Sequence, residues 1–131
     1  MSMILLGVFF ILHGLVHLLY TGQSLRLFEL RPAMTWPDGA WLFSKILGDR
    51  AARLVAAILL VLAALGFCVA GLGLLFQQGW WRSVTVGTAI FSTVIFLLFW
   101  DGKPKALDEK GGVGILINLA ILAVVLLLRW P

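Results

Sequence analysis

Two histidines stand inside an apolar stretch near the start of the chain, and they are the residues best suited to chemistry. His13 and His17 are four residues apart, so they share one helix face. Leu6, Phe10 and Tyr20 lie close to the same face. Because ionisable side chains in membrane helices face a bundle interior or a cavity, this face is a candidate functional site.

Other helical stretches carry polar residues at a similar depth. Asn118 lies six residues into the last apolar stretch, and Ser92 lies eight residues before Trp100. At 1.5 Å per residue these residues and His13 are each roughly 10 Å from the same end. We therefore expect a polar pocket in the cytoplasmic half, walled by Phe10, Phe96 and Phe99. The expected ligand-binding residues are His13, His17, Tyr20, Ser92, Asn118 and Asp101, with His17, Tyr20 and Asp101 nearest the mouth.

Several kinds of chemistry fit this arrangement. Apolar walls with a few converging polar groups are typical of a small-molecule site, here for a quinone-like or isoprenoid-like lipid. Histidines at i and i+4 can also hold a metal or haem, although no third ligand lies at matching depth. A proton relay is a further alternative. Hydrogen bonds that only join the helices are the structural alternative.

The composition shows what must position these residues. Of 131 residues, 62% are hydrophobic and only 12% are charged, which is far from the balance of a soluble domain. A span needs roughly 20 apolar residues, so the chain has room for four crossings and no separate domain. We expect an all-α integral membrane four-helix bundle that forms one domain over residues 1–131. Its predicted spans are 3–20, 54–76, 83–100 and 112–128.

The connection 21–49 is the only long one and is expected to lie at the membrane surface. Trp36-Pro37-Asp38-Gly39 is typical of a turn, because proline presets the backbone and glycine accepts positive φ. Residues 40–47 follow, between a possible N-cap at Asp38 and a stop at Gly48. This segment predicts a short interfacial helix.

The positive charges predict the orientation. Five of the ten Lys and Arg residues lie in or beside the first connection and three lie in the third, which leaves Arg82 and Arg129 on the other side. Because short cytoplasmic loops retain positive charge, we expect both termini outside the cytoplasm and a location in the inner (plasma) membrane. The tryptophans should gather at the two interfaces.

Two helix faces have a distinct character. Small residues form a stripe along the second span, which predicts its packing face: Ala52, Ala56, Ala63, Gly66, Ala70 and Gly73. Hydroxyls at Thr85, Thr88 and Ser92 share one face of the third span. Hydroxyls in such helices usually bind their own backbone carbonyls.

Catalysis and nucleic-acid binding find no support in the sequence. The chain has no nucleophile elbow and no phosphate-binding glycine loop, and all six acidic residues fall in predicted loops. A proton-coupled antiporter normally needs a carboxylate inside the membrane, so this class is disfavoured as well. We expect no catalytic activity of the chain's own.

The first span resembles a known family. Residues 6–18, Leu-Gly-Val-Phe-Phe-Ile-Leu-His-Gly-Leu-Val-His-Leu, together with four helices in about 130 residues, resemble the DoxX-like group of small bacterial membrane proteins. Gly14, His17 and Leu18 match the most typical part of the family pattern. The resemblance implies a four-helix inner-membrane protein, in some relatives a membrane subunit linked to quinone-dependent oxidation of sulfur compounds.

The leading functional hypothesis is the binding of a lipid-soluble small molecule in the polar pocket. A non-catalytic accessory subunit of a larger membrane complex is the main alternative, and a haem or metal site on His13 and His17 is the second. The expected partners are the lipid bilayer and either other membrane subunits or further copies of the chain.

Overall fold

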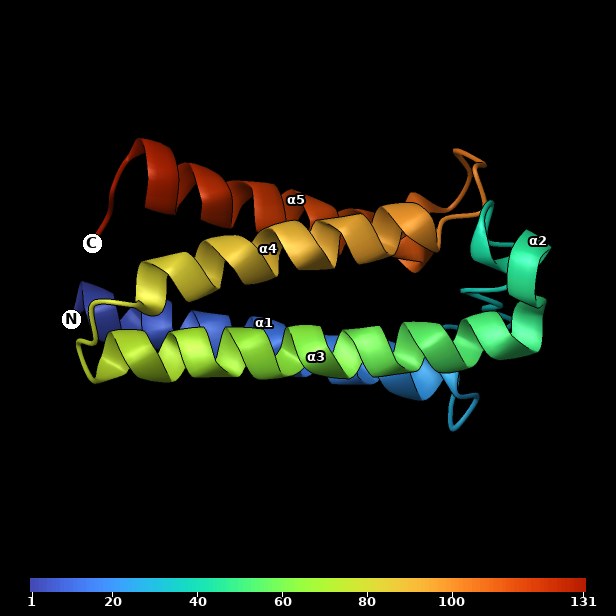
Figure 1. Cartoon of the computed structure of the whole chain (residues 1–131), viewed down its shortest axis with the longest axis horizontal. Coiled ribbons are helices and arrows are strands. Elements are labelled where there is room, and N and C mark those ends of the chain that lie inside the picture. The colour runs from blue at the N-terminus through green and yellow to red at the C-terminus, as the bar shows by residue number, and fades with distance from the viewer.

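The computed structural model describes residues 1–131 and is all-α, with no strands. Figure 1 shows α1 and α3 side by side, with α4 and α5 beyond them; both termini lie at one end of the bundle. We call this the terminal end, and the opposite end, with α2 and the long connections, the loop end. The helices are α1 (Ser2–Ser24), α2 (Phe43–Leu47), α3 (Asp49–Leu75), α4 (Trp81–Leu98), the 3-10 turn Leu107–Lys110, α5 (Gly112–Leu122) and a π-helical end at Ala123–Leu127.

Length and hydropathy mark three helices as able to cross a membrane. These are α1, α3 and α4, with 23, 27 and 18 residues. The continuous helical stretch Gly112–Leu127 is apolar but shorter. Many large apolar side chains on the outer faces of the helices are exposed.

Close approach of α1 and α3 forms the most extensive contact of the bundle, because small residues face each other there. A Cβ atom on Gly14 would lie 2.9 Å from the Ala64 carbonyl oxygen. One on Gly71 would lie 2.5 Å from the Gly7 carbonyl oxygen. The predicted small-residue face of α3 is confirmed at Ala52, Ala56, Ala63, Ala70 and Gly73, which are buried, while Gly66 is half-buried against Thr88.

Helix α5 is held more loosely than the other long helices. Helix α5 packs on α4, and Figure 1 shows it diverging from α1 and α3 toward the terminal end. Along α5 itself only Asn118 and Ile121 are buried. Arg82 of α4 donates hydrogen bonds to the carbonyl oxygens of Val125 at 3.2 Å and Pro131 at 3.1 Å. These bonds tie the end of the chain to α4.

The elements at the loop end differ from the sequence prediction in length. Helix α1 runs four residues beyond the predicted end of its span, to Ser24, because Gln23 and Ser24 are buried and bonded there. Gln23 Nε2 donates to the Met34 carbonyl at 3.0 Å, and Ser24 Oγ donates to the Arg53 carbonyl at 2.6 Å. Helix α2 has only five residues, compared with the predicted 40–47.

Two of the tryptophans predicted for the interfaces are buried. Trp36 is 5% exposed and Trp81 is 7% exposed, so both belong to the core. Trp36 packs against the rings of Tyr20 and Phe96, and Trp81 packs near Phe10. Trp41, Trp80 and Trp130 are exposed, as an interfacial position requires.

Candidate functional site

Four buried polar side chains from three helices meet in the middle of the bundle. His13 Nε2 lies 2.8 Å from Asn118 Oδ1, and His17 Nε2 lies 2.6 Å from Ser92 Oγ. Asn118 Nδ2 donates to Ser92 Oγ at 2.9 Å. The sequence predicted that His13, Ser92 and Asn118 would meet at one level, and the structure brings them together.

The directions of these hydrogen bonds follow from one another. His17 Nδ1 lies 2.8 Å from the His13 carbonyl oxygen and must donate to it, so His17 Nε2 accepts from Ser92. Ser92 Oγ then accepts from the Asn118 amide, whose oxygen accepts from His13 Nε2–H. For neutral imidazoles, these directions correspond to an Nδ1-protonated His17 and an Nε2-protonated His13.

Thr93 is a further member that the sequence analysis missed. Its Oγ1 accepts the second Asn118 Nδ2 hydrogen at 3.2 Å and donates to the Ala89 carbonyl of its own helix at 2.8 Å. Only its position next to Ser92 in the sequence pointed to it. We call His13, His17, Ser92, Thr93 and Asn118 the central network.

Tyr20 and Asp101 lie outside the central network, at the loop end. Tyr20 Oη donates to the Asp108 carbonyl at 3.3 Å, and Asp101 Oδ2 lies 3.0 Å from Lys110 Nζ. The buried ring of Phe96 packs between His17 and Tyr20, with centroid distances of 5.9 and 5.2 Å. The structure therefore divides the six predicted residues into two groups.

The central network lies deeper than the sequence predicted. Helix α1 extends to Ser24, so His13 is eleven residues, or roughly 16 Å, from that end and near the helix midpoint. None of the five main cavities has a network residue in its lining. The network side chains fill the space that would have formed a pocket around them.

An apolar groove of about 280 Å³ lies beside the network, between α1 and α5. Phe9 and Phe10 precede His13 by one helical turn, and Ile117 and Ile121 flank Asn118. The Phe9 ring is parallel to the His13 ring at a centroid distance of 6.1 Å. The groove extends toward the terminal end, and its lining residues are Leu6, Phe9, Phe10, Ile117, Ala120, Ile121, Val124 and Val125.

The histidine pair does not form a shared metal site in this arrangement. The Nε2 atoms of His13 and His17 bind different partners, and no group of three His, Cys, Asp or Glu side chains is placed to hold a metal ion. Cys68 is half-buried next to Gly14 and lies outside the network.

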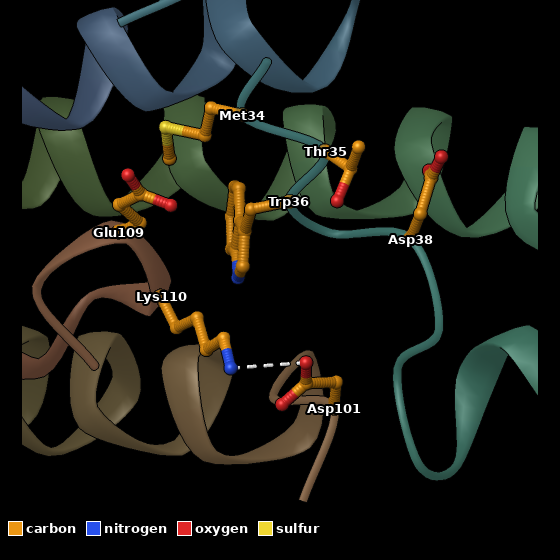
Figure 2. A pocket seen from close by; sticks show the side chains of 7 residues that line it. All are labelled: Met34, Thr35, Trp36, Asp38, Asp101, Glu109 and Lys110. Atoms are coloured by element: carbon orange, nitrogen blue, oxygen red, sulfur yellow. Dashed lines mark ion pairs between the residues drawn. The ribbon is translucent and has the colours of Figure 1, made fainter. Parts of the chain in front are cut away.

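Charged side chains gather at the loop end around a second, smaller cavity. Figure 2 shows its lining, which consists of Met34, Thr35, Trp36, Asp38, Asp101, Glu109 and Lys110. Arg53 binds Asp38 through two hydrogen bonds of 2.6 Å, and Arg26 lies 3.0 Å from the same carboxylate. Partial burial raises the pKa of Asp101, but the Lys103 backbone N–H and the Lys110 ammonium lower it further, so the pKa lies below its ordinary value.

No family model, curated protein or solved structure matches this chain. The likeness of residues 6–18 to the DoxX-like group stays a prediction.

Proposed function

We propose that the chain is an integral membrane protein with four crossings. Three helices of sufficient length and hydropathy support this, and so do the exposed apolar side chains around the bundle. The fourth stretch, Gly112–Leu127, is roughly 24 Å long at 1.5 Å per residue and crosses with help from the chain end that follows it.

The proposed orientation places the loop end in the cytoplasm of a cell with an inner membrane. Eight of the ten Lys and Arg residues lie at that end, and the remaining two are Arg82 and Arg129. A C-terminal alkaline phosphatase fusion should be active and a C-terminal GFP fusion should be dark. A fluorescent GFP fusion would contradict this orientation.

The function we propose is the binding of a lipid-soluble small molecule, quinone-like or isoprenoid-like, in the groove between α1 and α5. The observation that carries it is the position of an apolar groove one helical turn from a buried polar network. An apolar tail would fill the groove, and a polar head at its inner end would be directed toward His13, one helical turn beyond Phe9 and Phe10. Such a combination of apolar walls and a few polar groups is typical of ligand sites.

His13 offers a hydrogen-bond acceptor for that head. Its Nε2 binds Asn118, whereas its Nδ1 takes part in no hydrogen bond and is not fully enclosed. In the Nε2-protonated form Nδ1 carries a lone pair. A ligand hydroxyl, as in a quinol or an isoprenoid alcohol, could donate to it without disrupting the network.

Mass spectrometry of the purified protein tests this function. The protein is extracted in mild detergent, and the copurifying lipids and quinones are identified and counted. Ala120→Trp should block the groove and remove the ligand, whereas Leu119→Trp, on an exposed face of the same helix, should retain it. A wild-type protein without a stoichiometric lipid-soluble ligand, or equal ligand content in the two variants, would refute the proposal.

A second candidate is an accessory subunit of a larger membrane complex. It is favoured by the closure of the central network, which leaves its side chains bonded to one another and lining none of the main cavities. In this case the network only joins the helices. Crosslinking in native membranes should then recover a defined partner, and ligand content should be unaffected by Ala120→Trp.

A further inference from the structure

The loop end contains the one buried side-chain polar atom that has no hydrogen-bond partner. This atom is Nε1 of Trp36, whose side chain is 5% exposed. Figure 2 shows the indole nitrogen directed toward the part of the cavity formed by Lys110 and Asp101. Because a buried N–H without an acceptor is unfavourable, the geometry requires an occupant that accepts a hydrogen bond.

The cavity is shaped by contacts that do not involve an occupant. Gln23 Nε2 donates to the Met34 carbonyl at 3.0 Å, and Arg26 donates to the Trp36 carbonyl at 2.8 Å. Arg53 holds Asp38 through two hydrogen bonds. The backbone around Trp36 is therefore fixed to α1 and α3 by contacts within the chain.

The charges of the lining disfavour an ionic group inside the cavity. Three carboxylates, on Asp38, Asp101 and Glu109, repel an anion. The Lys110 ammonium is already bonded to Asp101 and to the carbonyls of Lys103 and Lys105. A cation is disfavoured as well, because Trp36 presents a donor and each carboxylate already lies beside an arginine or lysine.

We propose that this cavity binds uncharged polyol hydroxyl groups, either those of a free polyol or the terminal diol of a lipid glycerol headgroup whose phosphate stays outside the cavity. A hydroxyl accepts from Trp36 Nε1–H and at the same time donates to a carboxylate oxygen of Asp101 or Glu109. The cavity volume is about 40 Å³, which is room for roughly three water-sized groups. That space fits the terminal diol of a glycerol unit and excludes a sugar ring.

Nuclear magnetic resonance of the indole N–H groups tests the proposal. The protein is labelled with ¹⁵N-tryptophan and held in a phosphocholine detergent, because maltoside detergents and glycerol buffers would supply polyol. Glycerol should shift the Trp36 indole proton downfield and leave Trp41 unmoved, since Trp41 Nε1 already donates to the Leu97 carbonyl at 2.8 Å. Trp36→Phe identifies the signal and Trp41→Phe is the matched control.

A second arm distinguishes the two sources of the hydroxyls. Nanodiscs of phosphatidylcholine receive a minor fraction of phosphatidylglycerol or of phosphatidylethanol, which has the same charge without the hydroxyls. A Trp36 shift with phosphatidylglycerol alone assigns the lipid headgroup. A shift with glycerol but with neither lipid assigns a free polyol.

Binding measured by native mass spectrometry should weaken about three- to tenfold in Trp36→Phe, as for one lost neutral hydrogen bond. It should be unchanged in Trp41→Phe. If the Trp36 signal of the wild-type protein responds to neither glycerol nor phosphatidylglycerol, the cavity holds only water and the proposal is wrong. The wild-type titration gives this answer even if Trp36→Phe fails to fold. It is also independent of the groove between α1 and α5.

Discussion

The middle and the loop end of the bundle satisfy their polar groups in different ways. In the middle, five neutral side chains from α1, α4 and α5 form the central network, in which only one histidine nitrogen lacks a partner. At the loop end, ion pairs surround a small cavity and one indole N–H is left open. A polar group surrounded by apolar side chains must hydrogen-bond to other groups of the protein. At the loop end, water or a ligand can be the hydrogen-bond partner instead.

The largest expected effect is the loss of stability on removal of Asn118 from the central network. Asn118→Leu deletes hydrogen bonds to His13, Ser92 and Thr93 and leaves their polar atoms buried. At roughly 0.6 kcal/mol per interhelical bond in membrane proteins, the variant should lose about 2 kcal/mol. Unfolding in mixed micelles by increasing SDS measures this free energy.

Leu119→Ala is the matched control for this substitution, because the side chain of Leu119 is exposed on the same helix. It should change the free energy of unfolding little. Equal losses in Asn118→Leu and Leu119→Ala would show that the network does not join α5 to the bundle.

A smaller effect is expected at the loop end, where water screens the charges. Asp38→Asn removes the carboxylate that binds both Arg53 and Arg26, and its side chain is 22% exposed. The loss should be about 1 kcal/mol, with faster hydrogen exchange in residues 34–38. In Asp108→Asn, which breaks a more exposed pair with Arg31, stability should change little. A larger loss of stability in Asp108→Asn than in Asp38→Asn would show that Asp38 is not the residue that mainly holds the first connection in place.

Acid should weaken the Asp101 ion pair at the loop end. The pKa of Asp101 is lower in the fold than in the unfolded chain, so its contribution is present above about pH 4 and is lost as pH falls through the folded pKa. The change should be under about 1 kcal/mol for this partly exposed pair. The free energy of unfolding is measured between pH 3 and 6. Toward acid pH it should fall less in Asp101→Asn than in the wild-type protein. Identical pH profiles for the two proteins would contradict this role.

The sequence contained enough information for the helices and for four of the six predicted site residues, His13, His17, Ser92 and Asn118. Helix existence followed from the apolar stretches, and the meeting of His13, Ser92 and Asn118 followed from counting residues at 1.5 Å each. That count used the wrong helix end, because Gln23 and Ser24 are polar and read as loop. Their burial depends on contacts with Met34 and Arg53, which lie far along the chain.

The cavity around Trp36 could not be predicted for a similar reason. Tryptophan near the end of a span usually lies at an interface, and composition gives no sign that Trp36 is buried. Its position depends on Arg26, Arg53 and Gln23, whose side chains fold the first connection back onto the helices. Loop conformation set by such long-range polar contacts has no periodic signal in sequence.

The smallest effect separates hydroxyls that join helices from hydroxyls that bind their own helix. Thr93 and Thr85 each donate to a carbonyl four residues earlier, but only Thr93 also accepts from a neighbouring helix, through Asn118. Thr93→Val should therefore cost about 0.5 kcal/mol, the value of one long interhelical bond. Thr85→Val should cost less, although Thr85 is the more deeply buried, because its hydroxyl joins no second helix. A Thr85→Val loss equal to that of Thr93→Val would mean that burial, and not the connection between helices, decides what a hydroxyl contributes. The central network would then stabilise the bundle by its packing alone.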